Sequence, residues 1–225
     1  MKKIILFLLP SKAIKSKILI QDLLINPFYS DKTLLLGFDN ENGSNYHLAK
    51  KLKCTIFFIK KDYSNLDEYK YDFLISCGWG YKIPNTVIKK SSVVSFNCHS
   101  SYLPDYKGRS AYKHYWANCE IKAGVTLHLL SNKFDEGNII IQKTCNLTLK
   151  DSPKSILIKQ SNLTKNLIPK AINLMQKKSI STIPQKGGRY FYPISKYKLF
   201  FHRTINVLLF LLKVNYRFYT PFKSC

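Results

Sequence analysis

The 225-residue sequence is short of acidic residues, and its six cysteines are widely spaced. Only 13 acidic residues oppose 36 lysine and arginine residues, which gives a formal net charge of +23. The cysteines form no C-x-x-C motif and have no histidine at ligand spacing, so we expect no metal site. Most of them stand in apolar runs, where free cysteine behaves as a small buried hydrophobe, and a reducing cytoplasm is the compartment that fits. The run at residues 207–212 is far below the ~18 apolar residues of a membrane span.

Lysine is in excess, whereas only four of the basic residues are arginine, at positions 109, 189, 203 and 217. A generic compositional bias is one explanation of this charge. A functional explanation is that strong positive potential attracts phosphates, nucleotides, folates and anionic membranes. Both interpretations stay open at this point.

Short apolar runs alternate with polar or amphipathic stretches of helical length. This alternation predicts an α/β domain with an open, mainly parallel, Rossmann-like sheet flanked by helices. The first apolar run ends at Pro10 without a small-residue cleavage site, so we expect a buried strand there and not a signal peptide. Ser152 and Pro153 suit the start of a long amphipathic helix to about residue 178. The expected strands are 4–9, 33–38, 55–59, 72–77, 93–98, 125–130 and 139–142.

The sequence changes character near its C-terminus, where residues 181–225 form a short basic and aromatic extension to a main domain at residues 1–180. One interpretation of the extension is an amphipathic helix packed on the domain. The other is a basic interfacial helix that touches anionic lipid. The basic residues that flank its apolar runs are Lys198, Arg203, Lys213 and Arg217.

Asn97 and His99 end an apolar, strand-like run. Side chains at positions i and i+2 of a strand share a face, so a hydrogen-bond donor and a titratable imidazole emerge together. The carboxyl ends of strands are where open α/β sheets build their ligand crevice. The spacing therefore indicates a site at this position.

Three segments in a fixed order resemble the signature of the folate-dependent formyltransferases. The run HSSYLP at residues 99–104, preceded by Asn97, matches the H-x-S-x-L-P run of that family. Residues 107–108 are Lys-Gly in place of a customary Arg-Gly. GVTLH at residues 124–128 is similar to the family's G-V-T-x-H strand, and residues 135–142 to its D-x-G-x-I-x-x-Q segment. The resemblance spans about residues 70–180 and implies that residues 1–180 are a catalytic domain.

This resemblance implies transfer of a formyl group from 10-formyltetrahydrofolate to a primary amine, without a metal. The catalytic residues of the family map onto Asn97, His99 and Asp135. Asn97 can donate a hydrogen bond to the developing oxyanion. His99 can donate or move a proton at neutral pH, and Asp135 would orient His99 and help to receive the proton. His128 lies inside an alternating strand and is expected to be structural.

The folate site is also implied by resemblance, because residues 71–84 are similar to the strand and loop that hold the pterin in this family. Backbone groups of the loop would bind the pterin edge, its side chains would shape an apolar slot, and residues 131–135 would close the other side. The expected cofactor-binding residues are Gly78, Trp79, Gly80, Tyr81, Ile83, Asn132 and Phe134.

The segment at residues 109–118 is similar to the sugar N-formyltransferases, so we expect the amine to belong to a nucleotide-linked amino sugar for surface polysaccharide or lipopolysaccharide synthesis. Glycinamide ribonucleotide stays an alternative, although the first strand lacks a glycine-rich phosphate turn. Methionyl-tRNA also stays open, although fewer than 50 residues follow the long helix. The expected substrate-binding residues are Ser101, Lys107, Gly108, Arg109 and Trp116.

A non-enzyme alternative is a membrane-surface or nucleic-acid-binding protein on an inactive formyltransferase scaffold. The presence of Asn97, His99 and Asp135 argues against it, since a binding protein has no chemical need for all three. We therefore expect a cytoplasmic enzyme and no nucleic-acid partner. A homodimer and a peripheral contact of the tail with the inner face of the membrane stay open.

Overall fold

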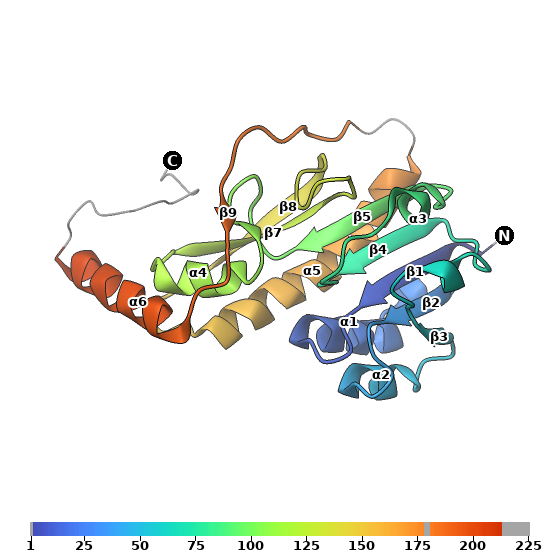
Figure 1. Ribbon diagram of the computed structural model, residues 1–225, viewed down its shortest axis with the longest axis horizontal. Coiled ribbons are helices and arrows are strands. Elements are labelled where there is room, and N and C mark those ends of the chain that lie inside the picture. Colours follow the sequence, from blue (N-terminus) through green and yellow to red (C-terminus); the bar gives the residue numbers. More distant parts are fainter. Residues whose placement is uncertain (1, 178–180, 213–225) are drawn as a thin grey trace.

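A computed structural model describes residues 2–177 and 181–212 of the protein. Its centre is a seven-stranded sheet with the order β3-β2-β1-β4-β5-β7-β8 (Figure 1). The first five strands of the chain pair in parallel, whereas β7 and β8 are antiparallel to their neighbours. The strands are β1 (Ile4–Leu9), β2 (Thr33–Phe38), β3 (Thr55–Phe58), β4 (Phe73–Cys77), β5 (Val94–His99), β7 (Lys122–Leu129) and β8 (Ile139–Asn146).

The parallel strands are apolar on both faces because both faces of the sheet are covered. In β1, Phe7 and Leu9 join one core cluster, and Leu6 and Leu8 join another on the opposite face. This alternation follows from the two-residue period of a strand. Continuous apolar sequence at β1 and β4 is therefore a direct consequence of double burial.

Two long helices cover one face of the sheet: α1 (Ile14–Ile25) and α5 (Pro153–Gln176). The α5 helix begins with a capping box, in which the Ser152 side chain accepts from the Ser155 backbone and Ser155 reciprocates. Its residues Leu167, Ile168 and Ile172 are buried in the same cluster as the α1 residues. The other face is covered by the 59–66 segment and by α3 (Asn85–Lys89). The remaining α-helices before α5 are α2 (Ser44–Ala49) and α4 (Ala111–Ala117), and two short 3-10 helices are η1 (Pro27–Tyr29) and η2 (Ser64–Leu66).

After α5 the chain returns across the molecule to its far end (Figure 1). Ile183 bridges to Ile139, and β9 (Tyr190–Phe191) pairs in parallel with β6 (Lys107–Gly108). We call residues 181–193 the strap. It leads into α6 (Lys196–Leu211), which packs against α4 through Leu199 and Asn206. The strap therefore connects the β8 edge of the sheet to α6.

The predicted fold class, an open and mainly parallel α/β sheet flanked by helices, is confirmed. The long helix predicted to reach about residue 178 ends at Gln176. The extension contains a helix that packs on the domain, although much of α6 is exposed. Lys213 and Arg217, which the sequence places beside the apolar runs, lie outside the described residues. Within the described part of the chain, no helix is long and apolar enough to cross a membrane.

Candidate active site

A cavity of about 870 Å³ opens at the carboxyl ends of β4 and β5. Most of its wall comes from six places in the chain: the start of α1, the 78–83 loop, the end of β5, the 108–112 segment, the 130–135 loop and the strap. Asp135 is the only acidic lining residue in the described part of the chain, whereas the basic lining residues are Lys15, Lys82, Arg109 and Lys133. The cavity therefore has a positive wall with one carboxylate in it.

Asn97 is held between side chains of the two neighbouring strands. The register of the sheet places Ser76 of β4 on one side of Asn97 and His128 of β7 on the other. The Ser76 hydroxyl donates to Oδ1 of Asn97 at 2.8 Å, and Nδ2 of Asn97 lies 3.2 Å from Nε2 of His128. Nδ1 of His128 lies 2.9 Å from the Leu129 carbonyl, which only accepts, and in the tautomer with its hydrogen on Nδ1 the Nε2 atom accepts from Asn97. This chain of bonds fixes which end of the Asn97 amide carries the donors.

His99 is buried at the end of β5, and both of its ring nitrogens face oxygen atoms. Nε2 lies 3.0 Å from the carbonyl oxygen of Tyr106, which only accepts, so this nitrogen carries a hydrogen. Nδ1 lies 3.3 Å from Oδ1 of Asp135. The backbone carbonyl of Tyr106 thus fixes the Nε2 edge of the ring, and the Nδ1 edge points at the Asp135 carboxylate.

Asp135 lies in the loop between β7 and β8 with a left-handed backbone, at φ 55°. Its Oδ2 accepts from the backbone N–H of Gly108 at 2.9 Å, and its Oδ1 faces the two histidine rings. Gln185 of the strap donates to the carbonyls of Asp135 and Gly137 at 3.1 and 2.6 Å. A left-handed non-glycine residue costs about 1–3 kcal/mol, so these contacts are needed to hold the loop.

Burial lowers the pKa of His99 below its ordinary value, and the Asp135 carboxylate opposes this shift without cancelling it. Burial alone would raise the pKa of Asp135. Its interactions with His99 and His128 and the Gly108 N–H outweigh that effect and hold the pKa below its ordinary range. At neutral pH the pair is therefore a neutral imidazole beside a carboxylate. Since Nε2 keeps the one ring hydrogen, two acceptors face each other and leave an open position for one proton.

The predicted folate residues converge on the same cavity. Gly78, Trp79, Gly80, Tyr81, Ile83, Asn132 and Phe134 all line it. Gly78 has a φ of 80°, which favours glycine over any residue with a Cβ. The Trp79 indole N–H donates to the Tyr63 hydroxyl at 2.8 Å, and that hydroxyl donates to the Lys82 carbonyl at 3.1 Å. The hydrogen bonds through Tyr63 therefore hold the 78–83 loop in place, while the Tyr81 and Phe134 side chains are exposed.

The predicted substrate residues divide into two groups. Gly108 and Arg109 line the cavity, and Arg109 reaches across it to donate to the Gly80 carbonyl at 2.5 Å. Ser101, Lys107 and Trp116 do not line it. Ser101 donates to the Asp105 carbonyl, and Lys107 donates to the Gly187 carbonyl at 3.0 Å and pairs with Glu136 at 3.5 Å. Trp116 packs on the outer side of α4 against Phe200, with ring centroids 5.1 Å apart.

Several residues that line the cavity were not predicted from the sequence to belong to the site. His128, which we expect to be structural, lines the cavity, contacts Asn97 and lies 3.6 Å from Asp135. Lys15 is buried beside the cavity, where its ammonium donates to the Cys98 carbonyl and to the Ser100 hydroxyl. Ser76 directs the Asn97 amide. The strap residues Tyr190 to Pro193 form part of the wall.

Metal chemistry has no evident ligand set in this site. Among residues 2–177 and 181–212, no group of three or more His, Cys, Asp or Glu side chains could hold a metal ion. The arrangement of Asn97, His99 and Asp135 instead offers amide N–H donors and a proton acceptor side by side. Such a set suits attack on a carbonyl carbon, where negative charge develops on oxygen and a proton must leave the attacking group.

A family of formyl transferases matches residues 39–172 of the chain. Among curated proteins, the methionyl-tRNA formyltransferase of Mycoplasmopsis pulmonis is 24% identical over 158 residues, which are 69% of this chain and 55% of that protein. Others of this kind, from Mycoplasma mycoides and Endomicrobium trichonymphae, are matched over 34% and 48% of their length. The chain thus spans only about a third to a half of these relatives.

Solved structures with the same fold cover more of the chain. An N-formyltransferase from Helicobacter canadensis, in complex with folinic acid and dTDP-3-aminofucose, aligns with a TM-score of 0.66 at 20% identity, over 95% of this chain and 82% of its own. Glycinamide ribonucleotide transformylase 1 from Symbiobacterium toebii aligns with a TM-score of 0.70 at 16% identity, over 82% of this chain and 95% of its own. At these identities the likeness concerns the fold.

Proposed function

Because the chain belongs to the formyl transferase family, we propose that it transfers a formyl group from 10-formyltetrahydrofolate to the primary amine of a nucleotide-linked amino sugar. The observation that carries this proposal is the convergence of Asn97, His99 and Asp135 on one wall of the cavity. Their atoms lie within 3.3–3.5 Å of one another through Oδ1 of Asp135. A general-base pair and an amide donor at this spacing can serve one reacting centre.

The reaction requires one bond to form and one to break. The uncharged amine attacks the formyl carbon, a new C–N bond forms, and the bond from that carbon to N10 of the folate breaks. The proton lost by the amine is returned to N10, so the products are a formamide and tetrahydrofolate. Both the charge on the formyl oxygen and the moving proton need protein groups that are in place beforehand.

Asn97 is suited to stabilise the negative charge on the formyl oxygen, because its contacts with Ser76 and His128 fix the orientation of its amide group. Removing a donor of this kind typically costs about 10²–10³ in rate. The second task falls to His99 and Asp135, whose facing acceptors have the open proton position. The pair can take the proton from the amine nitrogen and release it once the bond to N10 breaks.

The cavity wall supports a folate as formyl donor. The 78–83 loop offers backbone polar groups beside the apolar side chains of Trp79, Tyr81 and Ile83. This combination complements a pterin, which has a polar edge and an apolar face. Arg109 and Lys133 lie on the same wall and can meet carboxylates or phosphates. Folinic acid, a formylated folate, is present in the Helicobacter canadensis structure described above.

The amino-sugar acceptor is the finer part of the proposal. It is supported by the likeness to the Helicobacter canadensis enzyme, which holds dTDP-3-aminofucose and covers 95% of this chain. Methionyl-tRNA is the second candidate, because curated relatives include methionyl-tRNA formyltransferases. The two candidates differ in size, and only a tRNA would need a second large positive surface beyond the cavity.

Formyl transfer from 10-formyltetrahydrofolate, detected by mass spectrometry of the acceptor, tests both candidates. The panel contains dTDP-, UDP- and GDP-linked amino sugars, with glycinamide ribonucleotide and methionyl-tRNA as comparators. We expect the gain of one formyl group on a nucleotide sugar, and loss of that gain in the Asp135→Asn variant. Turnover with methionyl-tRNA alone would move the proposal to the second candidate. Wild-type protein that binds 5-formyltetrahydrofolate but formylates no acceptor would contradict the enzymatic proposal.

A further inference from the structure

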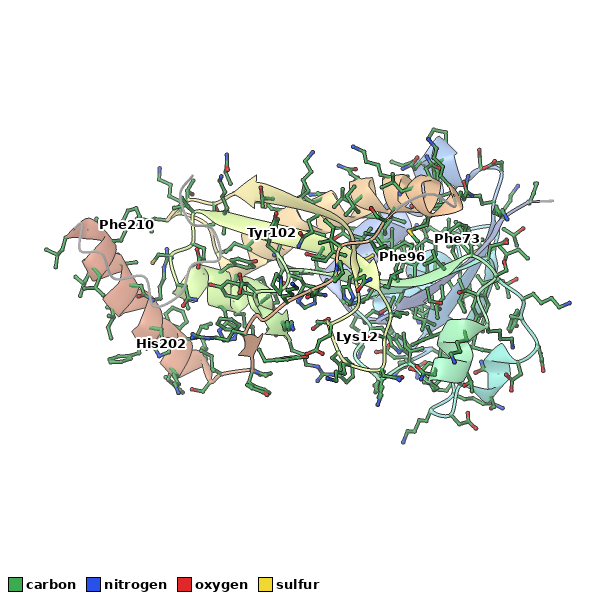
Figure 2. All side chains as sticks on the ribbon, turned by 90° about the horizontal axis from the view of Figure 1, so that it is seen from above. Lys12, Phe73, Phe96, Tyr102, His202 and Phe210 are labelled. Atoms are coloured by element: carbon green, nitrogen blue, oxygen red, sulfur yellow. The ribbon has the colours of Figure 1, made fainter. Side chains whose placement is uncertain are left out.

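Among the residues that the structure describes, helix α6 contacts the rest of the domain along one side. Arg203 donates to the Trp116 carbonyl at 2.6 Å and to the Leu149 carbonyl at 2.8 Å, and Asn206 donates to the Ala117 carbonyl at 2.8 Å. Leu199, on the same side, is buried. In both views α6 lies at one end of the long axis of the molecule, where Figure 2 labels His202 and Phe210.

The side of α6 turned away from α4 is apolar and exposed. Tyr197, Phe201, Leu208 and Leu211 are 88%, 64%, 55% and 66% exposed. Their spacing of four, seven and three residues keeps them on one side of the helix, over about 21 Å of its length. Thr204, which lies between them, donates its hydroxyl to the Phe200 carbonyl at 3.1 Å and so presents no unpaired donor. We call these four apolar residues the free face of α6.

The part of the sequence that contains this helix has ionisable side chains of one sign only among its acids and bases. All 13 acidic residues of the sequence lie at or before Asp151, whereas 14 of the 36 basic residues follow it. On α6 itself, Lys196 and Lys198 are exposed beside the free face. The high net charge is thus not spread evenly along the sequence, because the last third of the chain has no acidic side chain to offset its lysines.

We propose that the free face of α6 binds an anionic phospholipid surface, with the helix lying in the plane of the interface. Large apolar side chains enter the boundary between head groups and acyl chains, and flanking lysines meet lipid phosphates. A second copy of the chain fits less well, since pairing through α6 would bring two uncompensated basic segments together. Nucleic acid also fits less well, because Leu208 and Leu211 have nothing to offer phosphates or base edges.

The full chain is mixed with vesicles of phosphatidylcholine alone, or of about three parts phosphatidylcholine to one part phosphatidylglycerol, and sedimented. We expect the protein to pellet with the anionic vesicles and to stay in solution with the neutral ones. Raising the salt from about 0.1 to 0.5 M should weaken binding about tenfold, because the electrostatic part is screened. Equal binding to neutral vesicles would contradict the proposal.

Two variants locate the contact on α6. Phe201→Ser with Leu208→Ser should lower the vesicle partition constant about tenfold or more, because buried apolar area on the lipid side is lost. The matched control is Ile25→Ser with Ile121→Ser, which removes exposed apolar side chains elsewhere and should not change binding. Unchanged binding in the α6 variant, or equal loss in the control, would exclude the free face as the contact.

A charge variant keeps the proposal testable if the apolar variant fails to fold. Lys196→Glu with Lys198→Glu should weaken binding to anionic vesicles several-fold, while Lys61→Glu with Lys143→Glu, which changes the charge equally at exposed sites elsewhere, should not. Light scattering without lipid distinguishes self-association. A dimer that the Phe201 and Leu208 changes dissociate would assign the free face to a second copy and overturn the membrane proposal, as would release from vesicles by about equimolar RNA.

Discussion

Nδ1 of His99 lies 3.3 Å from Oδ1 of Asp135, while Nε2 of the same ring lies 3.0 Å from the Tyr106 carbonyl. Because burial keeps the pKa of His99 below its ordinary value, the ring has one hydrogen for two acceptors. The hydrogen stays on Nε2, since a carbonyl oxygen has none of its own to share. Nδ1, which faces Asp135, therefore carries no hydrogen and can accept a proton.

Replacement of His99 tests this relationship directly. His99→Ala should lower kcat by about 10²–10⁴-fold, the range of a general acid–base residue, and leave the Kd for 5-formyltetrahydrofolate within about threefold. The measurements are initial rates of tetrahydrofolate release and calorimetric binding. The control is His47→Ala, since His47 is exposed and does not line the cavity. Rates near those of the wild type would remove His99 from the mechanism.

The protonation of His99 can be followed without turnover. Its pKa should lie below 6.5, because burial penalises the charged ring more than the Asp135 carboxylate favours it. In Asp135→Asn the favourable charge is gone, so the pKa should fall further. The measurement is the chemical shift of the His99 Cε1 proton between about pH 4 and pH 8, assigned by comparison with the His99→Gln spectrum. A pKa that rises in Asp135→Asn would show that the carboxylate does not act on this ring.

Ser76 is the residue that fixes the Asn97 amide from the carbonyl side, with an O–O distance of 2.8 Å. Ser76→Ala should lower kcat about tenfold with little change in KM. The Asn97 amide then loses its preferred orientation toward the transition state, whereas binding of the ground-state substrate is unaffected. Steady-state kinetics with the preferred acceptor measure this split.

The matched control for Ser76 is Ser95→Ala. Ser95 is a buried serine of β5 that bonds to the Ile88 carbonyl and Ser91 and does not line the cavity. If both serine variants lower stability and activity in parallel, Ser76 has only a structural role. A rise in KM without a fall in kcat would likewise contradict the orienting role.

The strands were predictable because parallel strands buried on both faces appear in the sequence as uninterrupted apolar runs. Asn97 and His99 were predictable as a pair because a two-residue spacing guarantees a common face whatever the register of the sheet. Asp135 was reached only through the resemblance of its segment to a family pattern. The distance between its carboxylate and His99 depends on a loop that no local pattern predicts.

His128 and Ser76 could not be recognised as neighbours of Asn97, because each lies on a different strand and the contact depends on register. The alternation in β7 did indicate a strand, but not that His128 would point at the cavity. The directions of Ser101, Lys107 and Trp116 were equally hidden, since proximity in sequence to His99 does not fix which way a loop side chain turns. The return of the strap is a long-range contact between residues about fifty positions apart.

The strap contacts the Asp135 loop although it lies outside residues 1–180, so we expect it to contribute to catalysis. Gln185 donates to the backbone carbonyls of Asp135 and Gly137, and the Tyr190 hydroxyl donates to the Phe134 carbonyl at 2.7 Å. Gln185→Ala removes two hydrogen bonds from a loop with a left-handed residue, worth about 1–2 kcal/mol together. We expect kcat to fall about tenfold while the Kd for 5-formyltetrahydrofolate stays within about threefold, measured by initial rates and calorimetry.

Two controls separate the strap from the rest of the extension. Lys186→Ala changes an exposed neighbour of Gln185 and should leave kcat unchanged. A chain that ends at Ile194 keeps the strap and loses α6, so it should retain measurable formyl transfer, whereas a chain that ends at Lys177 should have none, because the Asp135 loop and the cavity wall at Tyr190 lose their support. Equal activity of the two truncated chains, at matched folded fractions by circular dichroism, would show that Asp135 holds its position without the strap.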